Sequence, residues 1–322
     1  MKKIHFASLL LSLIMILPFA LTSCDGEPET TTATPESTAA PSGTDDITTE
    51  EATVAEETTA MEEIKEFPKS LKILAIGNSF STDSMQYLYE IMKNGGVEEI
   101  TLGNLYYGGC SLDQHYQFAK NDSASYTYYK HTGRGWVKTA DYKMSQSLVD
   151  EKWDYVSLQQ TSKTCGLTNS YSKLDEMITI VKEKCPDAKL IWNMTWAYQQ
   201  DSTHASFPNY GKDQMKMYNM IIDVVNTVIA PLDFDVMIPC MTSIQNARTS
   251  FMGDTLTRDG YHLDYYIGRY IAGLTFIAAV TGLNIDSIEW APEGVDEYAK
   301  AVAIESVKNA LKYPLEIKKS EL

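Results

Sequence analysis

The sequence is poor in cysteine and has no excess of basic residues, and both scarcities limit what the protein can do. Only 5 of its 322 residues are cysteine, and no two of them form a CxxC pair. Neither a zinc finger nor a dithiol redox site is therefore predicted. Lysine and arginine number 27 against 43 acidic residues, which gives a net charge of −16 at pH 7. A surface that follows a nucleic-acid backbone needs a basic excess, so we expect no nucleic-acid partner.

The apolar run in residues 1–23 is too short and wrongly flanked for a stable membrane span. It follows two lysines and ends in Leu21-Thr22-Ser23-Cys24, which resembles the lipobox of bacterial lipoproteins. The resemblance implies that the signal peptide is cleaved before Cys24 and that this cysteine carries lipid. The chain would then be anchored to the membrane at the bacterial cell surface through this lipid alone, with its folded part outside the cytoplasm. An ordinary signal peptide with an incidental cysteine is the alternative.

Residues 24–66 lack aromatic side chains and are rich in Thr, Glu, Ala and Pro. Such a segment cannot bury enough apolar surface to offset its conformational entropy, so we predict a disordered tether. The tether holds 13 acidic residues and a single base, Lys65, whereas residues 67–322 hold 30 acidic and 24 basic residues, a net charge of −6. Much of the acidity therefore belongs to the tether.

Short apolar runs alternate with longer amphipathic ones in residues 67–322, which predicts a parallel sheet covered by helices on both faces. Strands are expected at about 71–76, 100–106, 154–159, 188–194 and 234–238. Helices are expected at about 82–94, 142–151, 171–185, 212–230, 263–281 and 294–312. The prediction is one α/β domain, a three-layer α/β/α arrangement around a five-stranded, mostly parallel sheet.

The four cysteines of this domain are widely spaced: Cys110, Cys165, Cys185 and Cys240. Outside the cytoplasm they can form disulfides in three different pairings, and sequence alone does not choose among them. Buried free thiols are the alternative.

Four short blocks stand at the predicted strand ends and near the C-terminus. They are IGNSFS at 76–81, NLYYGGCSL at 104–112, LQQTS at 158–162 and RDGYHL at 258–263. Open parallel sheets bind ligands at the carboxyl ends of their strands, and Ser79 lies just past the first such end. Taken alone, a serine in this turn is more often a helix cap than a nucleophile.

In this order the blocks resemble the SGNH (GDSL-like) hydrolase superfamily, in a mostly bacterial branch of it, over residues 71–281. The resemblance implies a flavodoxin-like fold and a serine ester hydrolase. Ser79 would be the nucleophile, His262 the general base, and Asp259 the acid that orients the imidazole. The chemistry needs these types, because a hydroxyl is a weak nucleophile until an imidazole fixed by a carboxylate removes its proton.

The same resemblance implies an oxyanion hole that includes the backbone N–H groups of Ser79 and Gly109, with Gly108 as an adjacent alternative. The third donor of the superfamily is an asparagine in the third block, and this sequence has none there. Gln159 or Gln160 is expected to supply an amide N–H in its place, with Ser162 as a weaker candidate.

Four further residues are expected to line the substrate site: Asn78, Tyr107, His115 and Trp196. Asn78 replaces the usual aspartate of the first block and is expected to brace the turn. His115 and Trp196 have structural packing as an alternative role. Aromatic faces near the site suit stacking on sugar rings.

The preferred function is a carbohydrate O-acetylesterase that acts on extracellular polysaccharide or glycan through an acyl-enzyme, without metal or cofactor. A lipase or thioesterase of the same superfamily is the nearest alternative. A glycan-binding lipoprotein on an inactive hydrolase scaffold is an alternative of a different class, motivated by the missing asparagine.

Overall fold

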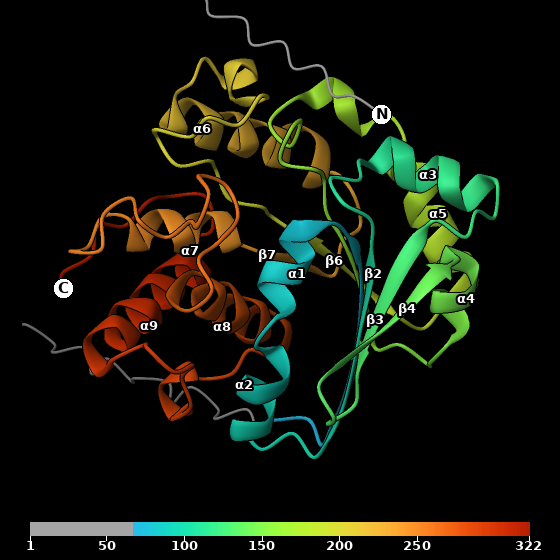
Figure 1. Ribbon diagram of the computed structural model, residues 1–322, viewed down its shortest axis with the longest axis horizontal. Helices are drawn as coiled ribbons and strands as arrows, with labels where there is room; N and C mark the ends of the chain where they lie inside the picture. Colours follow the sequence, from blue (N-terminus) through green and yellow to red (C-terminus); the bar gives the residue numbers. More distant parts are fainter. Residues whose placement is uncertain (1–66) are drawn as a thin grey trace, which may run out of the picture. The chain divides into compact units, whose positions relative to one another are not determined.

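The computed structural model describes residues 67–322 (Figure 1). The predicted signal peptide, the lipidation site Cys24 and the tether lie outside the described residues. Across residues 67–322, no helix combines the length and the apolar character needed to cross a membrane.

The sheet has seven strands in the order β4-β3-β2-β1-β5-β6-β7. They are β1 (Ser70–Gly77), β2 (Glu99–Tyr106), β3 (Tyr126–His131), β4 (Trp136–Tyr142), β5 (Tyr155–Leu158), β6 (Lys189–Asn193) and β7 (Val236–Ile238). The five predicted strands are present and pair in parallel, as β2-β1-β5-β6-β7. The prediction of a five-stranded sheet was wrong, because β3 and β4 extend it with an antiparallel hairpin.

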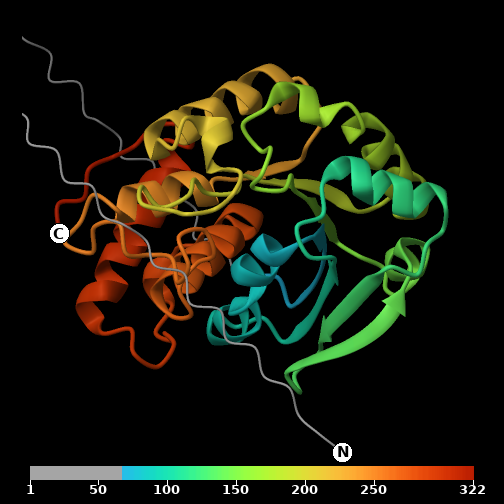
Figure 2. The ribbon, with the colours of Figure 1, turned by 45° about the horizontal axis from the view of Figure 1, so that its top comes forward.

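The hairpin lies at the edge of the sheet beyond β2 (Figure 2). Its outer strand, WVKTADY, is largely exposed and has no apolar run, so it gives no sign of a buried strand. The turn between the strands contains Gly133 and Gly135, whose φ angles of 107° and 81° favour glycine. An edge strand pairs with one neighbouring strand only, and its other edge faces solvent. The largely polar sequence of β4 is consistent with this position.

Helices cover both faces of the sheet, as predicted. They are α1 (Ser79–Met85), α2 (Leu88–Asn94), α3 (Leu112–Lys120), α4 (Met144–Val149), α5 (Leu174–Lys184), α6 (Gln214–Val224), α7 (Cys240–Ala247), α8 (Ile267–Thr281) and α9 (Glu297–Lys312). Figure 1 shows α1, α2, α7, α8 and α9 on one face and α3, α4 and α5 on the other. The helix predicted at 82–94 is two helices, and α3 and α7 were not predicted. All eight residues of α7 are buried, so it lacks the amphipathic stripe that identifies a surface helix.

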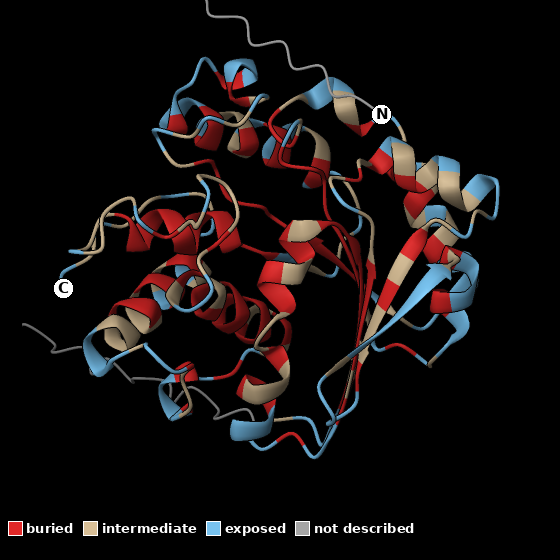
Figure 3. Cartoon of the chain, in the orientation of Figure 1, coloured by how far each residue is buried: buried red, intermediate tan, exposed pale blue. Residues whose placement is uncertain are grey.

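Helix α8 lies at the centre of its layer and fixes the position of α1 (Figure 3). Eleven of its 15 residues are buried, and it lies within the helix predicted at 263–281. Gly273 allows close packing here, because a Cβ on it would stand 2.9 Å from Ile91 Cδ1. A short helix packed on a buried one has little freedom, so Ser79 at the start of α1 is held in place.

The four cysteines of residues 67–322 are free and buried, so of the two alternatives left open by the sequence the structure has buried thiols and not disulfides. Burial raises the pKa of Cys165 and of Cys185 to about 11. Burial also raises the pKa of Cys110, next to the glycine block, far above neutral pH. Cys110 is therefore a protonated thiol and a poor nucleophile.

Candidate active site

The turn after β1 presents Ser79 as the first residue of α1. The cap of this helix is Asn78, whose backbone is extended and whose Oδ1 accepts a hydrogen bond from the Phe80 N–H at 3.0 Å. Ser79 is partly exposed, and no group within residues 67–322 bonds its hydroxyl. Because Asn78 caps the helix, the Ser79 hydroxyl has no capping role and is available for chemistry.

Asn78 connects three of the four blocks. Its Nδ2 donates to the Cys110 carbonyl at 3.0 Å, and its Oδ1 also accepts from Gln159 Nε2 at 3.0 Å. The neighbouring Gly77 has no room for a side chain, since a Cβ there would stand 2.6 Å from Ser81 Oγ. Asn78 thus braces the turn as predicted, but it is 2% exposed and does not line an open site.

The fourth block holds an aspartate–histidine pair. His262 Nδ1 lies 2.7 Å from Asp259 Oδ2, and the His262 backbone N–H donates to Asp259 Oδ1 at 2.8 Å. Partial burial raises the pKa of Asp259, but the hydrogen bonds from His262 outweigh it and leave this pKa below its usual value. An ionised Asp259 accepts the proton on Nδ1, which leaves Nε2 as the basic nitrogen of the imidazole.

Trp196 joins the Ser79 turn to the His262 loop. Its ring stacks on Phe80 with centroids 4.3 Å apart, and its Nε1 donates to the Tyr261 carbonyl at 2.8 Å. The Phe80 ring in turn meets the His262 ring edge-on at 5.9 Å. The two ends of the predicted triad, far apart in sequence, therefore lie on neighbouring segments. Trp196 is fully buried, which agrees with the packing alternative and not with a place in the lining of the site.

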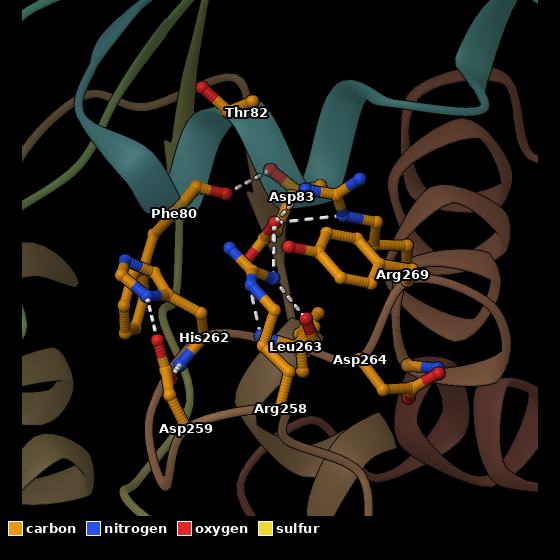
Figure 4. A network of polar contacts seen from close by, with 12 residues as sticks. Phe80, Thr82, Asp83, Arg258, Asp259, His262, Leu263, Asp264 and Arg269 are labelled. Atoms are coloured by element: carbon orange, nitrogen blue, oxygen red, sulfur yellow. Dashed lines mark hydrogen bonds and ion pairs between the residues drawn. The ribbon is translucent and has the colours of Figure 1, made fainter.

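A buried acid, Asp83, makes a second connection between α1 and the His262 loop, which was not predicted from the sequence (Figure 4). It lies one turn after Ser79 on α1 and is 0% exposed. Arg258 Nη1 lies 3.0 Å and Arg269 Nη2 2.7 Å from Asp83 Oδ1. The Leu263 N–H donates to Asp83 Oδ2 at 3.0 Å. Helix α1, which begins with Ser79, is therefore bonded directly to the segment that carries His262.

One sequence signal could have pointed to this network. Asp83 is the single charged residue of α1, SFSTDSM, and it stands on the side of the helix that is otherwise buried. A buried acid requires a partner, and Arg258 directly precedes the predicted Asp259. The pairing itself depends on tertiary folding, since 175 residues separate the two.

The glycine block has the backbone geometry expected of an oxyanion loop. Gly109 has a φ of 64°, and the turn is closed by a hydrogen bond from the Cys110 N–H to the Tyr107 carbonyl at 3.1 Å. The left-handed conformation favours glycine at this position. The structure brings this loop to the Ser79 turn through the bond from Asn78 to Cys110.

The two glutamines of the third block have structural partners. Gln160 Nε2 donates to the Ser170 carbonyl at 2.7 Å and to Ser170 Oγ at 3.1 Å, so both of its N–H groups are engaged. Its Oε1 accepts from the Leu112 N–H at 3.1 Å and the Thr161 N–H at 2.8 Å. This geometry argues against Gln160 as an oxyanion donor. Gln159 is 2% exposed and uses its amide to hold Asn78.

The other predicted lining residues differ in exposure. Tyr107 is partly exposed and packs edge-on against Phe118 at 5.0 Å. His115 is 1% exposed and its Nδ1 lies 2.9 Å from the Tyr126 hydroxyl, which agrees with the packing alternative and not with a place in the lining of the site. Burial lowers the pKa of His115 to about 3, which keeps this imidazole neutral.

Cavities of about 770 and 370 Å³ lie elsewhere, one along α9 and the C-terminal segment and the other near Gly166 and Met220. Neither is lined by a triad residue. In the part of the chain from 67 to 322, no three His, Cys, Asp or Glu side chains are grouped to hold a metal ion.

Comparison with protein families matches residues 72–310 to DUF4886, a domain of unknown function. The chain belongs to the DUF4886 family. The match begins in β1 and ends in α9, so it includes all four blocks. Comparison with curated proteins gives no significant match.

Among solved structures, a DUF4886 family protein from Bacteroides uniformis is 40% identical, with a TM-score of 0.75 over 78% of this chain and 98% of its own. A protein from Slackia heliotrinireducens, assigned to the SGNH hydrolases, is 18% identical, with a TM-score of 0.45 over 66% of this chain and 99% of its own. A catalytic mutant of an acetylxylan esterase from Geobacillus stearothermophilus is 9% identical, with a TM-score of 0.43 over 68% and 98%.

Proposed function

We propose that this DUF4886 protein is a serine ester hydrolase with Ser79 as nucleophile, His262 as general base and Asp259 as the orienting acid. The observation that carries the proposal is the 2.7 Å bond between His262 Nδ1 and Asp259 Oδ2 on a loop anchored beside the Ser79 turn. That bond leaves His262 Nε2 for the serine, and the Ser79 hydroxyl has no competing partner within residues 67–322.

The reaction proceeds by acyl transfer. Ser79 Oγ attacks the ester carbonyl carbon while its proton passes to His262 Nε2, and Asp259 stabilises the imidazolium that results. The tetrahedral intermediate collapses as His262 returns the proton to the leaving alcohol, which gives an acyl-serine. Water activated by His262 then attacks the acyl carbon, and the acid leaves as Ser79 regains its proton.

The substrate we propose is an acetylated carbohydrate. Tyr261 is partly exposed and its ring lies 4.1 Å from the His262 ring, while His204 meets Tyr261 at 4.5 Å. A partly exposed aromatic face next to the proposed general base, His262, suits contact with a sugar ring. The aromatic side chains of the loop after β6 are buried and fill the protein interior next to this face: Trp196, Tyr198, Phe207 and Tyr210. A filled interior favours a short acyl group over a long alkyl chain.

The location we propose is the bacterial cell surface. Cleavage before Cys24 and its lipidation would anchor the chain, and residues 24–66 would let the hydrolase domain reach polymeric substrate. The composition of these residues supports the tether, because they lack aromatic side chains and carry 13 acidic residues.

Labelling with a fluorophosphonate probe tests the chemistry without knowledge of the natural ester. We expect the purified wild-type chain to be labelled covalently and Ser79→Ala to remain unlabelled. Ser145→Ala, which changes an exposed serine bonded to Asp122, is the matched control and keeps full labelling. A folded wild type that resists the probe would favour a glycan-binding protein instead.

Hydrolysis of a series of esters then tests the substrate class. We expect acetylated xylan, acetylated monosaccharides and nitrophenyl acetate to be cleaved, with rates falling steeply for nitrophenyl esters of longer chains. A preference for long acyl chains, with no activity on acetylated sugars, would assign the protein to the lipases or thioesterases.

A further inference from the structure

The oxyanion hole lacks an assigned third donor. Both N–H groups of Gln160 are bonded to Ser170, and the Gln159 amide holds Asn78. The negative oxygen of the intermediate needs fixed positive groups, and the N–H groups of Ser79 and Gly109 are two of them. Another side chain, directly after the third block, lies against the glycine block.

That residue is Lys163, which directly follows the LQQTS sequence. A Cβ atom on Gly109 would stand 3.0 Å from Lys163 Nζ and 3.5 Å from its Cε. The ammonium group therefore lies against the loop whose N–H is expected to meet the substrate oxygen. Lys163 is exposed, so its charged end is open to an incoming ester.

The backbone around Lys163 is held by buried and bonded groups. The Tyr210 hydroxyl donates to the Ser162 carbonyl at 3.0 Å, and the Tyr198 hydroxyl donates to Ser162 Oγ at 3.0 Å. The Lys163 carbonyl accepts from Asn209 Nδ2 at 3.2 Å. Because the backbone at Lys163 is already held in place, less conformational entropy is lost when its ammonium group binds an anion.

Within residues 67–322, no carboxylate oxygen lies within 4.0 Å of Lys163 Nζ, so no salt bridge neutralises its charge. Partial burial lowers the pKa of His204, and the positive charge of the nearby Lys163 lowers it further. The His204 ring also meets the Tyr261 ring at 4.5 Å, so the imidazole near the Lys163 charge lies beside the fourth block.

We propose that Lys163 is a catalytic residue whose ammonium group donates the third hydrogen bond to the oxyanion. The proposal rests on the function proposed above and replaces the missing amide with a charged donor. As the carbonyl oxygen becomes negative, the N–H groups of Ser79 and Gly109 and the Lys163 ammonium stabilise it together. The bound acyl group displaces water from around the ammonium, which strengthens this interaction in the transition state.

The test compares Lys163→Met with the matched control Lys138→Met. Lys138 is exposed on β4 and lies on the hairpin edge of the sheet. In the full chain, we expect Lys163→Met to lower kcat for nitrophenyl acetate and the rate of fluorophosphonate labelling, each on the order of 100-fold, with little change in KM. Lys163→Arg, which keeps the charge, is expected to recover about tenfold of that loss. Lys138→Met keeps wild-type rates.

Two outcomes would overturn the proposal while leaving the hydrolase intact. A labelled wild type, an unlabelled Ser79→Ala and a Lys163→Met that reacts like wild type would remove Lys163 from the chemistry. A higher KM with unchanged kcat would make Lys163 a binding residue only. A folded wild type that the probe does not label would instead overturn the proposed function itself. The two failures are therefore distinguishable.

Thr161→Ala serves as a second comparison, because Thr161 carries a hydroxyl group and lies in the same loop. Thr161 is 4% exposed and follows Gln160 directly. We expect its loss to lower kcat much less than the loss of Lys163. The reverse order of effects would assign the third hydrogen bond to the hydroxyl and overturn the proposal.

Discussion

The Ser79 turn is held from two sides by different chemistry. On one side neutral amides make the contacts, as Asn78 binds the Phe80 N–H, the Cys110 carbonyl and the Gln159 amide. On the other side a carboxylate with 0% exposure, Asp83, is bonded to two arginines and a backbone N–H. We refer to these as the amide side and the ionic side.

The two sides have different tasks in the proposed mechanism. The amide side joins the nucleophile turn to the loops that stabilise the oxyanion. The ionic side joins the nucleophile helix to the segment that carries His262. Neutral hydrogen bonds contribute about 1 kcal/mol each, whereas removing one partner of a buried ion pair leaves a charge without compensation and costs about 3–5 kcal/mol. The position of the base therefore depends on the less tolerant of the two networks.

Asp83→Asn is expected to have the largest effect. The shape of the side chain is kept, but Arg258 and Arg269 lose their counter-charge, and the side chains of both are mostly buried, at 22% and 12% exposure. We expect the free energy of unfolding to fall by about 3–5 kcal/mol. Fluorophosphonate labelling below the melting temperature should fall by at least tenfold, because the His262 segment loses its attachment to α1.

Asp122→Asn is the matched control for this change. Asp122 pairs with Lys143 at 2.6 Å, but its side chain is 54% exposed. Solvent screens such a pair, so the variant is expected to melt and react like wild type. If Asp83→Asn matched Asp122→Asn in urea unfolding and in labelling, the Asp83 network would not hold the His262 segment in place.

Asn78→Ala tests the amide side and is expected to have the second largest effect. The variant leaves the Phe80 N–H, the Cys110 carbonyl and the Gln159 amide without their partner. We expect a loss of about 2–3 kcal/mol in the free energy of unfolding, with labelling slowed about tenfold or more because the oxyanion loop is released.

Asn284→Ala removes the same residue type from another helix cap, where Asn284 Oδ1 accepts from the Asp286 N–H at 3.0 Å on the surface. Loss of an exposed cap costs about 1 kcal/mol and leaves labelling unchanged. If Asn78→Ala proved as mild as Asn284→Ala in both assays, the bracing role of Asn78 would be lost.

Much of this arrangement is predictable from sequence because its signals are local. The five parallel strands are apolar runs that end at turn residues, and their carboxyl ends collect the blocks at one edge. Asp259 and His262 are three residues apart, so one loop brings them together. The position of Ser79 relative to His262 came from a family resemblance, since no local pattern specifies it.

The rest was not predictable because it depends on contacts between distant segments. A tryptophan near a strand end reads equally well as a sugar platform or as a core residue, and only the stacking of Trp196 on Phe80 decides. The same holds for His115, whose burial against Tyr126 follows from the position of a helix that was not predicted. The hairpin was missed because its outer strand is exposed and polar.

Gln160→Ala separates the structural role of this residue from the donor role expected from sequence. The variant leaves the N–H groups of Leu112 and Thr161 without their acceptor. A donor role predicts a large fall in kcat with normal stability. The structure predicts the opposite, a loss of about 2 kcal/mol in the free energy of unfolding with labelling slowed less than tenfold.

Gln146→Ala is the control for Gln160, because Gln146 makes its bond to the Lys143 N–H, at 3.0 Å, in an exposed position. We expect it to lose less than 1 kcal/mol. A normal melting temperature for Gln160→Ala, with kcat reduced about 100-fold, would restore Gln160 as the donor and count against Lys163.

The smallest effect is expected for His115, whose buried imidazole makes the stability of the protein depend on pH. Burial lowers the pKa of its imidazole to about 3, whereas the unfolded chain has the ordinary value near 6.5. Between these values the unfolded chain binds one more proton than the folded protein, so stability falls as the pH falls. The contribution of one such group is about 1.4 kcal/mol per pH unit below 6.5.

Urea unfolding of wild type and His115→Phe at pH 7, 6 and 5 isolates this contribution. At pH 7 the variant loses the bond to the Tyr126 hydroxyl and is expected to be the less stable of the two. The gap should narrow by about 1 kcal/mol or more towards pH 5, because only wild type has a histidine here to protonate on unfolding. The carboxylates of the two proteins are the same and cancel in the difference. If the stabilities of the two proteins changed with pH in parallel, His115 would already be solvated in the folded protein. The packing of α3 against Tyr126 would then be looser than its buried contacts indicate.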